Sequence, residues 1–195
     1  MNATRGWALS LALLVPALAG AGQIYTIDPG HSAVAFSVRH LIGQARGSFQ
    51  KFEGSFILDE KDLSKSSVKV TIDAASITTA NEKRDNHLRS EDFFWVAQNP
   101  TAEFASTKVE RNGRKGYKIT GDLTLRGITK PVILNVEALG EIKSPWGNLV
   151  AAYRATARIN RREWGLVWNK ALETGGFLVG DEVELQIEIE ASPRG

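Results

Sequence analysis

The side chains that could carry chemistry gather between residues 85 and 92. Asp85, His87, Glu91 and Asp92 bring carboxylates and one imidazole close together in the chain, and such groups can act as general acids and bases. A charged helix that pairs Asp85 with Arg89 at i, i+4 gives the same grouping without catalysis, and we prefer this interpretation. The sequence also lacks a Gly-x-Ser-x-Gly elbow and a phosphate-binding glycine loop. We predict that the protein is not an enzyme, and we keep an enzyme that uses Asp85, His87 and Glu91 as the alternative.

Metal ligands are few and poorly spaced. His31 and His40 are nine residues apart, so on one regular strand they would point to opposite faces. The chain has no cysteine, which excludes disulfides, thiol nucleophiles and thiolate ligands. It has no His-x-His or His-Glu-x-x-His spacing either. We expect no metal site and no cofactor.

The densest basic stretch contains Arg154, Arg158, Arg161 and Arg162. Alternation places Arg154 and Arg158 on the polar outer face of a strand. Arg161 is a candidate ligand for a phosphate-bearing head group, because arginine can donate two parallel hydrogen bonds to phosphate. The whole chain carries 24 Lys+Arg against 22 Asp+Glu, a net charge of +2, so nucleic acid is not an expected partner.

The first residues have the layout of a secretory signal. Arg5 precedes an apolar run over residues 7–18, and small residues occupy positions 17, 19 and 21. The run is shorter than the roughly 18 residues that a spanning helix needs. We predict a signal peptide over residues 1–21, cleaved after Ala19 or Ala21, a periplasmic protein without stable membrane insertion, and one domain over residues 22–195.

Most of that domain alternates apolar and polar residues with a period of two, the pattern of half-buried strands. Val183, Leu185, Ile187 and Ile189, for example, alternate with glutamates and a glutamine. Short turns such as Asn112-Gly113 leave no room for crossover helices, which favours antiparallel pairing. About eight such strands can hide their edges by closing into a barrel, although a sandwich is the alternative. Phe49, Phe52 and Phe56 break the alternation, so a bulge or bend is expected near Lys51.

One segment has a helical rather than a strand pattern. Thr79, with Glu82 three residues later, forms a capping-box pattern that predicts a helix through about Arg89. Its apolar stripe is thin, because only Ala80 and Leu88 are apolar before Phe93. We expect this short helix to lie over one end of the barrel as a lid.

Four spaced runs of the sequence form a recognisable set. The runs are DPGHSAVAFSVRHL at 28–41, HLRSEDFF at 87–94 followed by Asn99-Pro100 and Phe104, GDLTLRGITKPV at 121–132, and INRREWGL at 159–166. Together they cover most of the domain and resemble, in the same order, the signatures of the YceI family of secreted lipocalin-like proteins. Trp95 and Trp164 depart from residues that are common in the family.

The resemblance implies an extended eight-stranded antiparallel barrel with one helix beside it. It also implies an apolar tunnel for the chain of an isoprenoid lipid, a polyprenyl phosphate or a quinone, that the protein carries or stores. A homodimer is compatible with the resemblance, and a barrel filled by its own side chains is a further alternative. The expected tail contacts are Val34, Phe36, Val38, Phe56, Phe94, Phe104 and Leu125, with His40, Arg161 or Asn169 near a polar head. Trp164 and Trp168 are also expected to bind the ligand.

Overall fold

The computed structural model describes residues 22–173 and 175–194, so the predicted signal peptide lies outside the described residues. Eleven strands form one continuous sheet. Their bounds are β1 Gln23–Ile27, β2 Ala33–His40, β3 Gly43–Phe49, β4 Phe52–Leu58, β5 Ser67–Asp73, β6 Ile77–Thr78, β7 Thr101–Arg111, β8 Gly116–Leu125, β9 Ile128–Lys143, β10 Leu149–Asn160 and β11 Val179–Pro193.

Eight of these strands close into a barrel. The order around the barrel is β1, β4, β5, β7, β8, β9, β10 and β11, and β11 pairs back with β1 from Tyr25↔Pro193 to Ile27↔Ala191. All the pairings are antiparallel. Closure gives every strand of the ring two partners, so the apolar faces point inward without an open edge. The predicted eight-stranded antiparallel barrel is confirmed, and the sandwich alternative is excluded.

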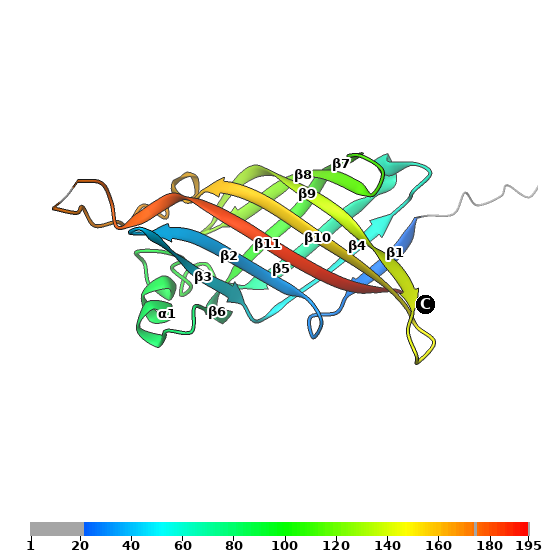
Figure 1. The fold of residues 1–195 in the computed structure, drawn as a ribbon, viewed down its shortest axis with the longest axis horizontal. Coiled ribbons are helices and arrows are strands. Elements are labelled where there is room, and N and C mark those ends of the chain that lie inside the picture. The colour runs from blue at the N-terminus through cyan, green and yellow to red at the C-terminus, as the bar shows by residue number, and fades with distance from the viewer. Residues whose placement is uncertain (1–21, 174, 195) are drawn as a thin grey trace, which may run out of the picture.

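The barrel is elongated because three more strands extend its wall (Figure 1). The first part of β11 pairs with β2, which pairs with β3, whose end pairs with β6. The chain turns between β3 and β4 at Gln50 and Lys51, after which β4 pairs with β1 and β5 instead. The predicted bend near Lys51 is therefore confirmed, and Phe49 and Phe52 pack in the same hydrophobic cluster on either side of it.

The predicted helix is present as α1, Glu82–Arg89, but its N-cap is Asn81. The Asn81 side chain accepts a hydrogen bond from the Arg84 amide at 3.0 Å. The prediction that Thr79 caps the helix was wrong, because the Thr79 hydroxyl and amide both donate to Asp85. Three short 3₁₀ turns complete the regular elements, η1 Leu63–Lys65, η2 Ala74–Ser76 and η3 Arg161–Trp164.

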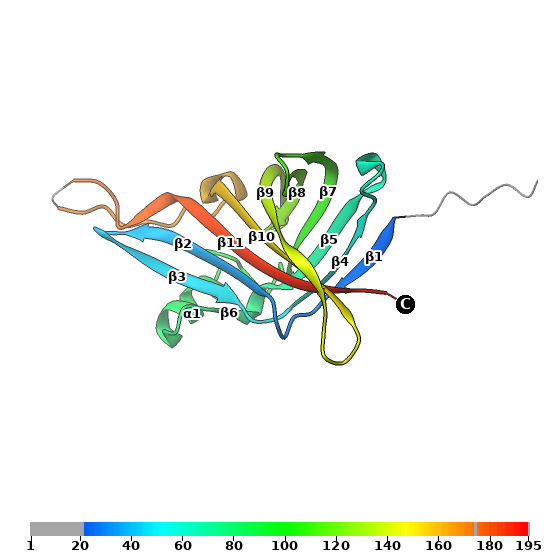
Figure 2. The same cartoon turned by 45° about the vertical axis from the view of Figure 1, so that its right-hand side comes forward.

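Side chains of α1 form hydrogen bonds with residues 75–79, the segment that precedes the helix. Asp85 accepts from the Thr78 hydroxyl at 3.1 Å and from the Thr79 amide at 2.8 Å. Arg89 donates to the carbonyls of Ala75 and Ile77, each at 2.7 Å. The expected i, i+4 ion pair between Asp85 and Arg89 is wrong, since both side chains are used to attach the helix. Figure 2 shows α1 beside β6 at the end of the barrel where β2 and β3 meet. Within the described residues, no helix is long and apolar enough to cross a membrane.

A candidate ligand cavity inside the barrel

A cavity of about 610 Å³ lies inside the barrel. Its volume is within the range of about 300–1,000 Å³ that is typical of small-molecule sites. The wall comes from the inward-facing residues of nearly every strand and from α1. Examples on the strand faces predicted from alternation are Val34, Phe36, Val38, Val68, Val70, Ile72, Leu123, Leu125, Val132, Leu134, Val183, Leu185, Ile187 and Ile189.

Many of these inward side chains are only half-buried. Phe36, Val38 and Leu185 belong to this class although they point into the barrel. Side chains in a self-filled barrel would contact one another across the axis and lose nearly all their accessible surface. Here their accessible surface borders the cavity. The geometry therefore argues against the alternative in which the barrel is filled by its own side chains.

Aromatic rings close the end of the cavity farther from α1. Tyr25 stacks on Phe56 with ring centroids 4.8 Å apart, and Phe56 meets Tyr153 edge-on at 5.4 Å. Burial raises the pKa of Tyr25 to about 12, and its hydrogen bond to Glu141 at 3.0 Å adds to the rise. Burial also raises the pKa of Tyr153 and of Tyr117. These hydroxyls therefore stay protonated at neutral pH and leave this end of the cavity uncharged.

The other end opens to solvent at the start of α1. Among the described wall residues, only Asn81, Lys83 and Arg84 are exposed. We call these three residues the cavity mouth. Arg84 is held in place because it donates to the Thr79 hydroxyl at 2.7 Å and to the Thr79 carbonyl at 2.9 Å. The wall is therefore mostly apolar, and its two exposed cations, Lys83 and Arg84, lie where it meets water.

The candidate catalytic residues have separate partners. Asp85 is buried, and burial alone would raise its pKa, but hydrogen bonds from Thr79 and Thr78 and the charge of Arg89 hold that pKa below its usual value. His87 lies on the cavity wall, and its Nε2 is 2.8 Å from an oxygen of Asp92. Glu91 is exposed and lies in a shallow depression outside the cavity. Within the described residues, no group of three or more His, Cys, Asp or Glu side chains is arranged to hold a metal ion.

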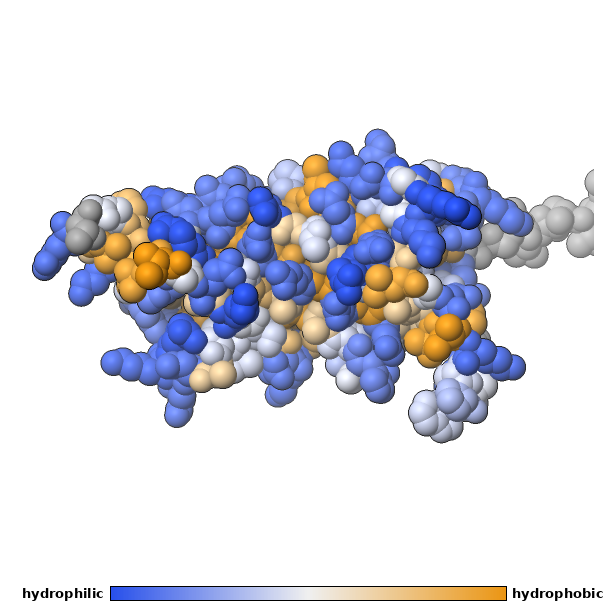
Figure 3. All heavy atoms as spheres, viewed as in Figure 1, coloured by the Kyte–Doolittle hydropathy of each residue, from blue (hydrophilic) through white to orange (hydrophobic). Residues whose placement is uncertain are grey.

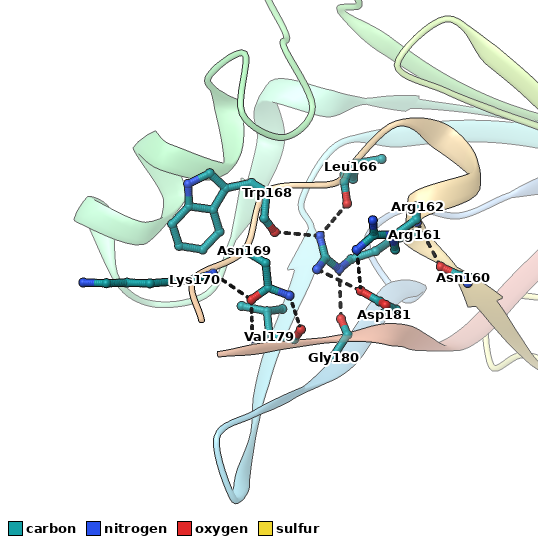
Figure 4. A network of polar contacts seen from close by, with 10 residues as sticks. All are labelled: Asn160, Arg161, Arg162, Leu166, Trp168, Asn169, Lys170, Val179, Gly180 and Asp181. Atoms are coloured by element: carbon teal, nitrogen blue, oxygen red, sulfur yellow. Dashed lines mark hydrogen bonds and ion pairs between the residues drawn. The ribbon is translucent and has the colours of Figure 1, made fainter. Parts of the chain in front are cut away.

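Arg161 is only 5% exposed, and its guanidinium holds a loop in place (Figure 4). Its Nε donates to the Gly180 carbonyl at 2.8 Å, and its Nη1 donates to the carbonyls of Leu166 and of Trp168, the latter at 3.0 Å. Its Nη2 donates to Asp181 at 3.1 Å. Burial lowers the pKa of Arg161 and Asp181 opposes this, but arginine stays protonated at any ordinary pH. Four of the five N–H donors are thus used within the protein.

Two of the predicted ligand residues lie away from the cavity wall. Trp164 is 1% exposed and packs in the core, where its Nε1 donates to the Leu123 carbonyl at 2.9 Å. Asn169 bonds to the backbone of Val179, accepting from the amide at 3.0 Å and donating to the carbonyl at 2.7 Å. The structure brings the other ten together on the wall, namely Val34, Phe36, Val38, His40, Phe56, Phe94, Phe104, Leu125, Arg161 and Trp168.

Sequence reasoning missed the cavity mouth. Lys83 and Arg84 belong to a charged helix whose residues resemble an ordinary solvated surface, and nothing in their spacing separates them from Glu82 or Asn86. Tyr153 and Phe49 also line the cavity. Because alternation places Arg154 on the outer face, its neighbour Tyr153 belongs to the inward face, so for this residue the signal was available.

A closed antiparallel barrel of eight strands around an apolar cavity that opens beside a helix defines the class of lipocalin-like barrels with an internal site. The particular family follows from comparison with known proteins. A YceI-like domain matches residues 25–191, and the chain belongs to the YceI family.

Relatives and solved structures agree with this assignment. A UPF0312 protein of Photorhabdus laumondii is 44% identical over 156 residues, which covers 78% of this chain and 81% of that protein. Burkholderia cenocepacia BcnA superposes with a TM-score of 0.74 at 22% identity, covering 84% of this chain and 98% of that one. A polyisoprenoid binding domain from Saccharophagus degradans, implicated in plant cell wall breakdown, superposes with a TM-score of 0.58 at 15% identity, covering 87% and 98%. At these identities the two structures show a shared fold.

Proposed function

We propose that this protein binds the apolar chain of an isoprenoid lipid inside the barrel. The observation that carries the proposal is the apolar cavity of about 610 Å³, which aromatic rings close at one end and α1 borders at the other. Removing apolar surface from water stabilises a complex by about 25 cal/mol per Å², so a chain of several isoprene units has ample driving force. The name of the Saccharophagus degradans domain supports this class of ligand.

The tail contacts that we propose come from strands on all sides of the barrel. Apolar walls discriminate weakly between similar chains, because each methylene contributes little on its own. We therefore expect the protein to accept chains of related length. The residues proposed for these contacts are Val34, Phe36, Val38, Phe56, Phe94, Phe104, Leu125 and Trp168.

We place the polar head of the lipid at the cavity mouth. Lys83 and Arg84 have no carboxylate oxygen within 4.0 Å in the described chain. Their charges favour an anionic head such as a phosphate over a neutral quinone ring. His40 and His87 lie on the wall and can donate or accept a hydrogen bond. Arg161 and Asn169 are weaker candidates because their polar atoms already bond to the protein backbone.

The proposed setting follows from the N-terminal sequence. Residues 1–21 act as a signal peptide, the domain of residues 22–195 is released in the periplasm, and it carries or stores its lipid there. We propose no catalytic role, because Asp85 is engaged by Thr78 and Thr79 and Glu91 lies outside the cavity. Bound lipid should therefore be recovered chemically unchanged.

A charge placed in the wall tests the proposal. Phe36→Arg puts a guanidinium into the apolar cavity and should abolish retention of extractable lipid, because an unpaired charge in an apolar site is strongly disfavoured. The matched control is Gln186→Arg on the adjacent strand, since Gln186 is exposed and pairs with Ala35 next to Phe36. Lipid is extracted from both purified proteins and quantified against wild type. Equal retention by a folded Phe36→Arg protein would remove this cavity as the lipid site.

A further inference from the structure

Three exposed apolar side chains form the end of the molecule beyond α1. Leu41 and Ile42 make the turn between β2 and β3, and Phe177 lies in the loop that leads into β11. Ile42 is fully exposed, Phe177 is 53% exposed and Leu41 is 42% exposed. The two segments touch, because the Leu41 amide donates to the Leu178 carbonyl at 2.9 Å. We call Leu41, Ile42 and Phe177 the apolar tip. Figure 3 shows apolar surface at this end of the molecule.

The backbone of the tip is strained where its side chains project. Leu41 has a φ of 53°, in the left-handed region that glycine, asparagine or aspartate usually occupies in two-residue hairpins. A bulky residue there costs of the order of a tenfold shift in the folding equilibrium. Exposure of an isoleucine beside it costs further in water. Neither Leu41 in this conformation nor the exposed Ile42 stabilises the isolated barrel. An unfavourable local conformation of this kind indicates a role other than folding.

Within the described residues, the cations around the tip have no carboxylate partner. Arg39, Arg46 and Lys170 are exposed. Arg39 donates to the Leu41 carbonyl at 3.0 Å, the Lys170 carbonyl accepts from the Leu178 amide at 2.9 Å, and Arg46 lies on β3, which starts at the tip. Lys83 and Arg84 lie at the cavity mouth. In the described chain none of the five has a carboxylate oxygen within 4.0 Å. Asp85 directly follows Arg84, but it is buried and bound by Thr78 and Thr79. The exposed acidic residues closest to the five cations in sequence are Glu82 and Glu173, so the exposed charges of these residues sum to a positive value. Its surface therefore complements a negatively charged partner.

The tip continues directly from the wall of the cavity. His40, Leu178 and Val179 are wall residues, and His40 and Leu178 adjoin Leu41 and Phe177 in the chain. Apolar surface thus runs from the inside of the barrel to the outermost side chains of the molecule. A partner in contact with the tip lies beside the cavity.

We propose that the apolar tip docks on an anionic lipid bilayer. Leu41, Ile42 and Phe177 enter the boundary between head groups and acyl chains, and the surrounding cations bind lipid phosphates, as in other peripheral membrane-binding surfaces. The proposal rests on the proposed function in one respect, because a bilayer is the source and destination of an isoprenoid lipid. Docking brings the cavity next to the bilayer, so the chain passes between them with little exposure to water.

A second exposed apolar site supplies a matched control. Ile142 is 69% exposed on the β9–β10 hairpin, at the end of the barrel opposite α1 (Figure 1). It lies between Glu141 and Lys143, away from the cavity mouth. Ile42→Asp and Ile142→Asp therefore make the same chemical change at two exposed positions, of which only the first belongs to the tip.

The test is flotation of the full-length gene product, purified from cells without detergent, with phospholipid vesicles. Wild type and Ile142→Asp should float with vesicles of phosphatidylethanolamine and phosphatidylglycerol but not with vesicles of phosphatidylcholine alone. Ile42→Asp should weaken binding to the anionic vesicles about tenfold or more, because it replaces an inserting side chain by a charge of the same sign as the lipid. High salt should weaken the wild-type binding as well.

Lipid retention, measured on the same samples, separates this proposal from the proposed function. Retained isoprenoid in a protein that does not bind anionic vesicles would overturn docking and leave lipid binding intact. Vesicle binding by a protein that never retains a lipid would support docking and contradict the proposed lipid binding. An equal loss of binding in both variants would show that the tip is not the docking site. A dimer that Ile42→Asp converts to monomers, without vesicle binding by wild type, would make the tip a contact between copies of the chain and overturn docking.

Discussion

Replacing Arg161 by alanine should destabilise the barrel rather than only weaken a ligand. The substitution removes four hydrogen bonds, to the carbonyls of Gly180, Leu166 and Trp168 and to the carboxylate of Asp181. Removing one partner of a buried charged network costs about 3–5 kcal/mol. Asp181 keeps contact with water, since its side chain is 44% exposed, so we expect the lower end, about 3 kcal/mol. This is a large part of the 5–15 kcal/mol that is typical of a domain's total stability.

The assay is urea unfolding followed by tryptophan fluorescence, with lipid retention measured on the folded protein. Arg162→Ala is the control, because Arg162 is exposed and only approaches Asp181, at 3.9 Å. An exposed pair of this kind contributes about 0–1 kcal/mol. If Arg161→Ala unfolds at the wild-type urea concentration and yet loses its lipid, Arg161 is a head-group ligand and the structural role argued from its hydrogen bonds is wrong.

Two predictions concern pH. Asp85 has a pKa below its unfolded value of about 3.9, so its contribution to stability is complete above that value and is lost as the pH falls through the lower folded pKa. Unfolding measured between neutral and strongly acid pH should show this loss in wild type and a smaller one in Asp85→Asn, and identical profiles would contradict the anchoring role. Tyr25, Tyr117 and Tyr153 are the three tyrosines of the chain, and all have raised pKa values. Their neutral forms stabilise the fold fully below the unfolded value of about 10, and this is lost at higher pH. Spectroscopic titration should show tyrosinate forming at higher pH in folded than in denatured protein, whereas coincident curves would mean that the closed end of the cavity is open to water.

The strand faces could be predicted from the sequence because the polarity of each residue indicates whether its side chain points into the barrel or to solvent. Val34, Phe36 and Val38 alternate with small or polar residues, and the same alternation recurs from β5 to β11. Closure into a barrel follows from many strands with one apolar face and short connections. Alternation does not say how much space the inward side chains leave, so the volume of the cavity needed the structure.

The polar residues were harder because their partners are distant in the chain. Thr79 and Asn81 are both good N-cap residues. Thr79 is bound to Asp85, and Asn81 caps the helix instead. Arg161 reaches Gly180 and Asp181, whose positions depend on the loop before β11. Asn169 bonds to Val179 in the same region. Local sequence gives the chemistry of such side chains but not the partners that use it.

The most direct test of lipid binding is native mass spectrometry of the protein made from its full-length sequence and purified without detergent. The account predicts a retained mass that extracts into organic solvent and fragments with the spacing of isoprene units, and the remaining mass identifies a phosphate or a quinone head. A protein that shows only its own mass, both as purified and after incubation with polyprenyl phosphates and isoprenoid quinones, would contradict the proposed function.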